Sequence, residues 1–400
     1  MIRRFFIDGT IKPVLGLGIT STIGYGTLFY SFTIMSLEFE NEFSWNKSFI
    51  FGIFSLGLLL GGLISPFIGK KLDKHGARII MSMGSFLAAL GMLFISFVET
   101  KFGFILSLLY IEIVATFILY EAAFVALSQI AKEKARLPMA QITLIAGFAS
   151  TIFWPLITFL LQMLSWREVY MILSLFHLFI ALPLHLFTLK NRVLNSDIKE
   201  YINSKAVLQL TKKQREKAMT LLTITFCLIS IPIAAIQLHL VGILQSFGIE
   251  AIMAVTLGAL IGPSQVGARI IEMLFANKTT PIQSAIISNT LIFVSLLCLL
   301  LSVYELFFAT FFVILYGAGQ GLNYIARGSL TLYVLSANSF GKNSGTLNLF
   351  IKITTAISPF SIALMLDFFG NVTTIIFLTI VAIFSFISLF YLRKVCKCLN

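Results

Sequence analysis

Long apolar runs recur along the whole chain, and each has about the length of a helix that crosses a lipid bilayer. A membrane-spanning helix needs about 20 consecutive, mainly apolar residues. Roughly twelve runs meet this condition, and they lie at about 13–36, 49–69, 78–98, 103–124, 140–164, 169–189, 219–243, 251–275, 282–303, 307–333, 343–365 and 372–392. The pattern predicts an all-α membrane protein with twelve transmembrane helices.

The composition excludes most other classes of protein. Only 12% of the residues are charged and 58% are hydrophobic, whereas soluble domains carry about 25% charged residues. The four cysteines are too few for a disulfide scaffold. We find neither a catalytic triad nor a phosphate-binding loop, and no spacing typical of metal ligands. The sequence therefore favours neither an enzyme nor an ATP-driven pump, and we expect no metal and no cofactor.

One long polar stretch, residues 190–217, divides the chain near its middle. It leaves six apolar runs in residues 1–189 and six in residues 218–400, and we expect two six-helix bundles joined by this linker. The halves also share a short motif, because Gly61–Pro66 (GGLISP) in the second run resembles Gly258–Pro263 (GALIGP) in the eighth. Parallel repeats of this kind are typical of one large class of transporters, in which the substrate binds between the halves.

The distribution of charge indicates the orientation in the membrane. Cytoplasmic connections are enriched in Lys and Arg. Most of the 29 Lys and Arg residues fall on the side of the N-terminus, including Arg3, Arg4, Lys70, Lys71, Lys132, Lys134, Lys212, Lys213, Arg393 and Lys394. The opposite connections hold mainly acids: Glu38, Glu40, Glu42, Glu99, Glu168, Glu250, Glu305 and Asp367. We expect a multi-pass inner-membrane protein with both termini in the cytoplasm. The net charge of +12 then faces the lipid surface, so nucleic acid is not an expected partner.

The connection between the second and third runs carries a recognisable motif. Gly69, Asp73, Gly76 and Arg78 follow the spacing G-x-x-x-D-x-x-G-x-R, which resembles the gating loop of the major facilitator superfamily. Glycines permit a tight turn there, and Asp73 suits the positive end of a helix. The resemblance covers essentially the whole chain and implies a secondary transporter that works by alternating access.

A narrower resemblance concerns the first and eighth runs. Tyr30-Ser31-Phe32, followed by Glu42–Lys47, is similar to the end of helix 1 in monocarboxylate porters and oxalate–formate antiporters. That branch has an Asp four residues before a substrate-binding Arg in helix 8, and here Arg269 matches the Arg whereas Gln265 replaces the Asp. The resemblance implies a small organic anion as substrate, but it supplies no proton-coupling residue at position 265.

Ionisable residues inside apolar runs require a reason, because a charge at membrane depth costs about 2.5–3.5 kcal/mol on insertion scales. Arg269 and Glu272 are three residues apart on one helical face and can pair, so they suit either an ion pair or an anion site. Lys352 lies near the middle of its run on a face of small and polar residues, which favours a lysine that faces a cavity. These neighbours are Gly341, Gly345, Asn348, Thr355 and Pro359. A similar stripe contains Gln320 and ends at Arg327.

Two glutamates in the fourth run are candidates for carrying a proton. Glu112 and Glu121 lie about half a turn apart on a regular helix, so only one of them faces a cavity. Glu112 shares its face with Thr116 and Tyr120, which makes it the better candidate, whereas Glu121 lies nearer the cytoplasmic end. His177, in the sixth run, is more often a hydrogen-bonded packing residue than a site.

The leading interpretation is a monomeric, proton-linked secondary transporter of a small organic anion. Its candidate substrate-binding residues are Arg269, Lys352, Gln265, Tyr30 and Gln320, and its candidate proton-coupling residues are Glu112, Glu121 and Glu272. Two alternatives stay open: a proton-driven exporter of drugs or metabolites, with aromatic residues lining a broad pocket, and a sensor or scaffold that transports nothing. The linker and tail are short for a signalling domain.

Reporter fusions test the predicted orientation. Reporters placed within residues 190–217 and at the C-terminus are expected to be cytoplasmic, and one after Asn41 is expected outside, because the basic connections face the cytoplasm. Opposite locations for the linker and the C-terminus would contradict an even number of spans.

Overall fold

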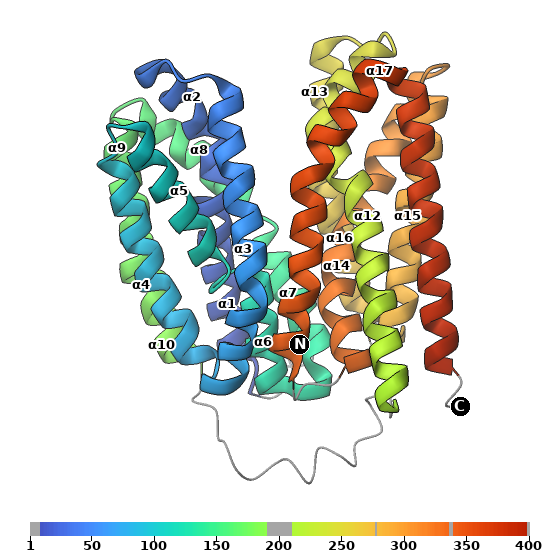
Figure 1. The fold of residues 1–400 in the computed structure, drawn as a ribbon, viewed down its shortest axis with the longest axis horizontal. Helices are drawn as coiled ribbons and strands as arrows, with labels where there is room; N and C mark the ends of the chain where they lie inside the picture. The colour runs from blue at the N-terminus through green and yellow to red at the C-terminus, as the bar shows by residue number, and fades with distance from the viewer. Residues whose placement is uncertain (1–8, 190–209, 277, 336–338, 398–400) are drawn as a thin grey trace. The chain divides into compact units, whose positions relative to one another are not determined.

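The computed structural model describes residues 9–189, 210–276, 278–335 and 339–397, and these residues are almost entirely helical (Figure 1). In this part of the chain, ten helices are long and apolar enough to span a membrane. The last of them, α17 (Phe340–Lys397), has a break at Gly370, where φ is 77°, and so contains two helices. The consecutive segments α1, η2 and α2 cover Ile11–Phe43, the first predicted run. The all-α prediction is confirmed, and the helices are consistent with twelve spans.

The chain forms two compact units. Unit 1 contains Met1–Ser204 together with Ala337–Lys352, and unit 2 contains Lys205–Ser336 and Ile353–Asn400. The first part of α17 therefore packs with the N-terminal helices, whereas the sequence alone groups it with the C-terminal bundle. The predicted linker at 190–209 lies outside the described residues, and α12 begins at Lys212, within the range predicted as linker.

Unit 1 is built from the following segments: α1 (Ile11–Gly24), η2 (Tyr25–Tyr30), α2 (Ser31–Phe43), α3 (Lys47–His75), α4 (Ala77–Ser96), α5 (Lys101–Ala115), α6 (Tyr120–Ala131), η3 (Lys132–Ala135), α7 (Arg136–Ala146), α8 (Ala149–Leu161), α9 (Trp166–Phe176), η4 (His177–Ala181) and α10 (Leu182–Thr188). Two of these, η2 and η4, are π-helical. They are joined across the core by the side chains of Thr27 and His177, whose Oγ1 and Nε2 atoms are 2.7 Å apart. His177 is fully buried, which confirms that it is a packing residue.

Unit 2 consists of α12 (Lys212–Ser246), α13 (Ala251–Ala259), α14 (Ile261–Phe275), α15 (Pro281–Leu301), α16 (Leu306–Leu335) and the later part of α17. Hydrogen bonds between buried side chains connect these helices. Asn289 of α15 donates to the Ser385 hydroxyl at 2.8 Å, and that hydroxyl donates to the carbonyl of Thr225 in α12 at 2.9 Å. Such bonds satisfy polar groups that lipid cannot hydrogen-bond.

Several predicted spans are interrupted, and this corrects one argument drawn from the sequence. The fourth run is not a regular helix, because α5 ends at Ala115, a turn follows, and α6 begins at Tyr120. The half-turn relation between Glu112 and Glu121 therefore does not hold. The fifth run is likewise divided into α7 and α8, and the eighth into α13 and α14. Interrupted helices in transporters supply backbone groups and bends near binding sites.

A charged clamp stabilises one end of unit 1. The Arg167 guanidinium donates to both Glu42 carboxylate oxygens at 2.6 and 2.8 Å and to the carbonyl of Val98 at 2.9 Å. The Trp166 indole also donates to Glu42, at 2.5 Å. Partial burial raises the pKa of Glu42, but the hydrogen bonds from Trp166 and Arg167 outweigh it and hold the pKa below its ordinary value. The clamp connects α2, α9 and the end of α4.

Two pairs of glycines allow helices to approach each other closely. In unit 2, a methyl group on Gly317 of α16 would lie 2.6 Å from the carbonyl oxygen of Ile261, and one on Gly321 would lie 2.7 Å from that of Gln265. In unit 1, Gly57 and Gly61 of α3 make the same kind of contact with Glu112 of α5. Small residues four apart are typical of tightly packed membrane helices.

Replacing Gly317 by alanine tests this packing. Alanine in mid-helix is ordinarily more stable than glycine by about 0.5–1 kcal/mol, but here the added methyl meets the backbone of α14, and overpacking costs about 1–3 kcal/mol. We expect Gly317→Ala to lower the melting temperature of the purified protein. Gly242→Ala is the matched control, because nothing lies within 4 Å of a methyl group there, and its melting temperature should stay the same or rise. Equal stability of the two variants would contradict the close approach.

Candidate functional site

A chain of polar side chains crosses unit 2. The guanidinium of Arg269 donates to the amide oxygen of Gln265 at 3.4 Å, and the Gln265 amide donates to Gln320 at 2.7 Å. The Gln320 amide in turn donates to Gln237 of α12 at 3.5 Å. The chain thus links α14, α16 and α12 within a membrane-spanning unit. The structure brings together Arg269, Gln265 and Gln320, three of the residues predicted to bind substrate.

Arg269 is positioned by its packing. Its side chain is only 3% exposed, and its guanidinium lies over the ring of Tyr324, 5.9 Å from the ring centre. The close approach of α14 to Gly321 sets this arrangement, because it brings the backbone of Gln265 against α16. A guanidinium beside an amide and an aromatic ring has the chemistry that can bind an anion.

Glu272 has a different environment from the polar chain. It is 6% exposed, and both of its carboxylate oxygens accept from the hydroxyl of Ser284 in α15, at 2.9 and 3.1 Å. The contact therefore gives Glu272 an anchoring role between α14 and α15.

Unit 1 places two predicted residues beside the same helix. Glu112 of α5 is 2% exposed, and a methyl group on Gly57 would lie 2.7 Å from its Cγ atom. A methyl group on Gly61 would lie 3.2 Å from the ammonium nitrogen of Lys352. The face of α3 that carries Gly57 and Gly61 thus contacts both Glu112 and Lys352.

Three of the small and polar residues on the predicted face of Lys352 pack against α3. Gly341 lies against Gly69, and Gly345 lies against Ser65 and Pro66 of α3. Asn348 continues this contact by donating to the Ser65 hydroxyl at 3.0 Å. Lys352 follows at the end of the packed segment, with its Cβ against Gly62, and its side chain is half-buried.

The predicted gating loop is shorter than the sequence indicates. Gly69 and Asp73 lie in the last turns of α3, which extends to His75, and the helix ends at Gly76, where φ is 82°. Arg78 lies in the first turn of α4. The polar residues 70–75 made this stretch resemble a loop, but they continue the helix beyond the apolar run. The side chain of Gln129 bridges the turn, accepting from Ala77 at 3.0 Å and donating to Leu72 at 2.9 Å.

Asp73 caps the start of α17. Its two carboxylate oxygens accept from the backbone amides of Gly341 and Lys342, at 2.9 and 2.8 Å. The first amides of a helix have no partners within the helix, and its positive end attracts an anion. The expectation that Asp73 lies at a helix N-terminus is therefore confirmed, with α17 as the helix.

The remaining candidates lie elsewhere in unit 1. Tyr30 ends the π-helical segment η2, and its carbonyl accepts from the Trp154 indole at 3.1 Å. The rings of Tyr25 and Trp154 also lie near it, at 6.4 and 5.9 Å between ring centres. Glu121 lies in the first turn of α6, after the interruption that separates it from Glu112.

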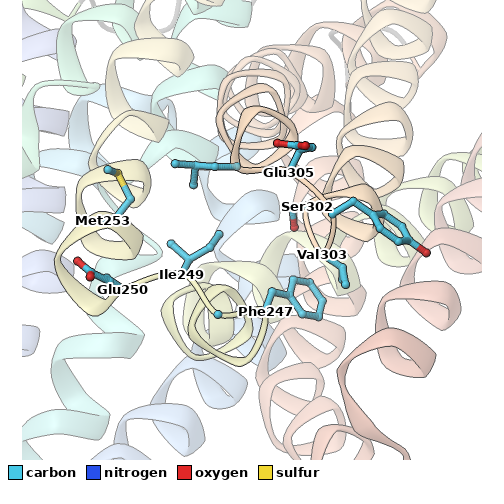
Figure 2. A pocket seen from close by; sticks show the side chains of 10 residues that line it. Phe247, Ile249, Glu250, Met253, Ser302, Val303 and Glu305 are labelled. Carbon is cyan, nitrogen blue, oxygen red and sulfur yellow. The ribbon is translucent and has the colours of Figure 1, made fainter.

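A surface pocket of about 340 Å³ lies at the ends of helices in unit 2 (Figure 2). It lies between the connection that joins α12 to α13 and the one that joins α15 to α16. Its lining includes two carboxylates, Glu250 and Glu305, with apolar neighbours such as Phe247 and Met253. No predicted site residue lines it, and its charge does not suit an anion.

Some residues of these clusters are not predicted from the sequence. Gln237, Tyr324 and Ser284 are ordinary polar residues in apolar runs, and only their partners give them significance. Gln129 and Ser65 are similar cases. The repeated G-x-x-x-G spacing of Gly57 and Gly61, and of Gly317 and Gly321, is a signal from which both clusters could have been found.

Comparisons with known proteins agree with this architecture. The sequence profile of the Major Facilitator Superfamily matches residues 14–348. Monocarboxylate transporter 13 of Rattus norvegicus is 30% identical over 174 residues, which span 43% of this chain and 39% of that relative.

Solved structures of low sequence identity share the fold. The human organic anion transporter MFSD10 has a TM-score of 0.70 at 14% identity, covering 96% of this chain and all of the other. The transporter FucP has a TM-score of 0.73 at 15% identity, covering 96% of this chain and 99% of the other. FucP is the fucose:proton symporter of E. coli. A bacterial homologue of the iron transporter ferroportin has a TM-score of 0.76 at 12% identity, covering 97% and 100%. These likenesses establish the fold, and the profile match over residues 14–348 confirms the family resemblance.

Replacing Asp73 by asparagine tests the cap on α17. Asparagine keeps one acceptor oxygen but loses the charge and the second acceptor, so the amides of Gly341 and Lys342 should open more often. We expect hydrogen–deuterium exchange at the start of α17 to accelerate about tenfold, which corresponds to ~1.4 kcal/mol. The exposed neighbour Lys74 provides a control, since Lys74→Gln should leave this exchange unchanged. Unaltered exchange in Asp73→Asn would contradict the capping role.

Proposed function

The chain belongs to the Major Facilitator Superfamily, and on that premise we propose that it is a proton-linked transporter of a small organic anion that carries a carboxylate. Members of this family are membrane transporters and not enzymes, so the open question is the substrate. The observation that carries the proposal is a buried arginine, Arg269, inside a spanning helix, whose guanidinium donates to the amide oxygen of Gln265.

The polar chain of unit 2 suits a carboxylate. An arginine guanidinium is planar and binds carboxylates through two parallel hydrogen bonds, which a lysine does not provide. Gln265 and Gln320 offer amide groups beside it, with which they would orient the rest of a small polar molecule. Burial strengthens such bonds, because the local dielectric is low.

Residues of unit 1 support the same substrate class. Lys352 is a second cation within a spanning helix, and Tyr30 supplies a phenol with an aromatic neighbour. We propose Arg269, Lys352, Gln265, Tyr30 and Gln320 as the substrate-binding residues. The relative titled a monocarboxylate transporter and the neighbour titled an organic anion transporter are in line with this proposal.

The fold alone does not select the substrate. Its solved neighbours include proteins titled as a fucose:proton symporter and as a homologue of an iron transporter. The aromatic group of Tyr25, Tyr30, Tyr120 and Trp154 in unit 1 favours a second candidate, an exporter of larger aromatic or cationic compounds. Arg269, Arg327 and Lys352, three cations within spanning helices, weigh against a cationic cargo.

The remaining features of the proposal follow from the sequence. We propose that residues 1–189 and 218–400 are two helical bundles in an inner membrane, with both termini in the cytoplasm. A proton gradient would drive transport without a cofactor, and a single chain would be the functional unit.

Substitution of Arg269 tests the substrate class. A charge-assisted hydrogen bond is worth about 1.5–3 kcal/mol, so its loss weakens binding roughly ten- to a hundred-fold. We expect Arg269→Gln to raise the dissociation constant for lactate or oxalate by that order, measured by calorimetry on purified protein. Arg269→Lys should restore little of the carboxylate affinity, because lysine lacks the planar guanidinium with its two parallel N–H donors.

The exposed Lys213 provides the control, since Lys213→Gln should bind as the wild type does. A folded Arg269→Gln protein with unchanged carboxylate affinity would contradict the anion site. Tight binding of cationic drugs by the wild type, without any carboxylate binding, would favour the exporter.

A further inference from the structure

The glycine notch, which we define as Gly57 and Gly61 of α3, borders two opposite charges. The Glu112 side chain fills the space at Gly57, and the Lys352 ammonium lies at Gly61. The two glycines are four residues apart, so these contacts lie about one helical turn, ~6 Å, apart along α3. Lys352 belongs to the part of α17 that packs within unit 1. One face of α3 therefore contacts both an acid, Glu112, and a base, Lys352.

The notch depends on glycine at both positions, because neither Gly57 nor Gly61 has a Cβ atom. A methyl group on Gly61 would lie 2.8 Å from the carbonyl oxygen of Glu112 and 3.2 Å from the Lys352 nitrogen. Any larger residue at either position would separate α3 from α5 or push Lys352 away. The packing therefore holds both charged groups against the same surface.

Lys352 is the charged side chain placed beside Glu112 at the notch, because its ammonium lies at Gly61, one turn from the Glu112 side chain at Gly57. The Glu112 carboxylate is 2% exposed and so receives little help from water. Among the described elements that pack against α5, η2 brings only the phenols of Tyr25 and Tyr30. The charges of α3 and α4 lie near the ends of those helices, at Lys70, Lys71, Asp73, Lys74, His75 and Arg78. Tyr110 of α5 itself points to α4, where its hydroxyl donates to the Leu87 carbonyl.

We propose that Glu112 and Lys352 form a proton-switched anion site at the glycine notch, where one proton and one carboxylate bind together. This inference rests on the proposed function and specifies how proton binding is coupled to anion binding. While Glu112 is ionised, it neutralises Lys352 and repels a second carboxylate. When a proton binds to a carboxylate oxygen of Glu112, the ammonium of Lys352 becomes available to the anion.

Charge balance makes the two binding events depend on each other. The empty site, with ionised Glu112 and Lys352, has no net charge, and the site loaded with a proton and an anion has none either. A site with the proton alone carries +1, and one with the anion alone carries −1, and both are costly in a buried environment. By linkage, the proton strengthens anion binding by the same factor by which the anion strengthens proton binding.

Proton uptake on binding tests this coupling. Lactate, a monoanion, is titrated into the full-length purified protein by calorimetry at several pH values, in pairs of buffers with different heats of ionisation. The wild type is expected to take up about one proton per bound anion. Its dissociation constant should rise by up to about tenfold per pH unit once Glu112 is ionised in the empty protein.

Glu112→Gln supplies a permanently neutral side chain. It is expected to bind the anion with an affinity that does not change with pH and without proton uptake. Glu99→Gln, at an exposed carboxylate outside the notch, should behave like the wild type. If Glu112→Gln does not fold, Lys352→Gln replaces it: without the ammonium, the anion loses its partner at the notch, so proton uptake on anion binding should be lost.

The results separate this inference from the proposed function. Carboxylate binding without proton uptake in the wild type would overturn the switch and leave anion transport standing. Full proton uptake retained in Glu112→Gln, or uptake lost in Glu121→Gln instead, would overturn it as well. Failure of the wild type to bind any tested carboxylate at any pH would contradict the proposed function itself.

Discussion

Close approach of helix backbones at glycine pairs is the constraint on which both polar clusters depend. Helices in lipid gain little from burying apolar surface against each other, since lipid is equally apolar, so packing contacts and small residues decide where they meet. Gly57 and Gly61 bring α3 onto α5, and Gly317 and Gly321 bring α16 onto α14. In each unit, the contact places an ionisable residue, Glu112 or Arg269, beside its polar partners.

Neutral hydrogen-bonding groups contact several ionisable side chains in the described part of the chain. Glu272 is held by a serine hydroxyl, and Arg269 contacts a glutamine amide and an aromatic ring. Asp73 uses the amides at the start of a helix. Such partners lower the cost of a charge at membrane depth without cancelling it.

The sequence was sufficient to predict the fold and many of the residues in the two polar clusters. Run length predicts the spans, and the G-x-x-x-D-x-x-G-x-R spacing predicts the family and the position of Asp73. It does not predict the interruption after Ala115, because residues 103–124 contain neither proline nor an internal polar break. It also assigns residues 70–75 to a loop, since hydropathy reports the membrane boundary and not the end of the helix. Contacts such as Ser284 with Glu272 depend on tertiary packing alone.

The cap on α17 has a consequence for the middle of the membrane. Gly341, which Asp73 holds, and Lys352 are eleven residues apart on one uninterrupted helix, about three turns or 16 Å. Eleven residues make about three full turns, so Gly341 and Lys352 lie on nearly the same face of the helix. Because the segment is one continuous helix, any rotation of its capped end about the helix axis would turn Lys352 by the same angle. The cap at the end of α3 and the direction in which Lys352 projects are thus linked through the helix backbone.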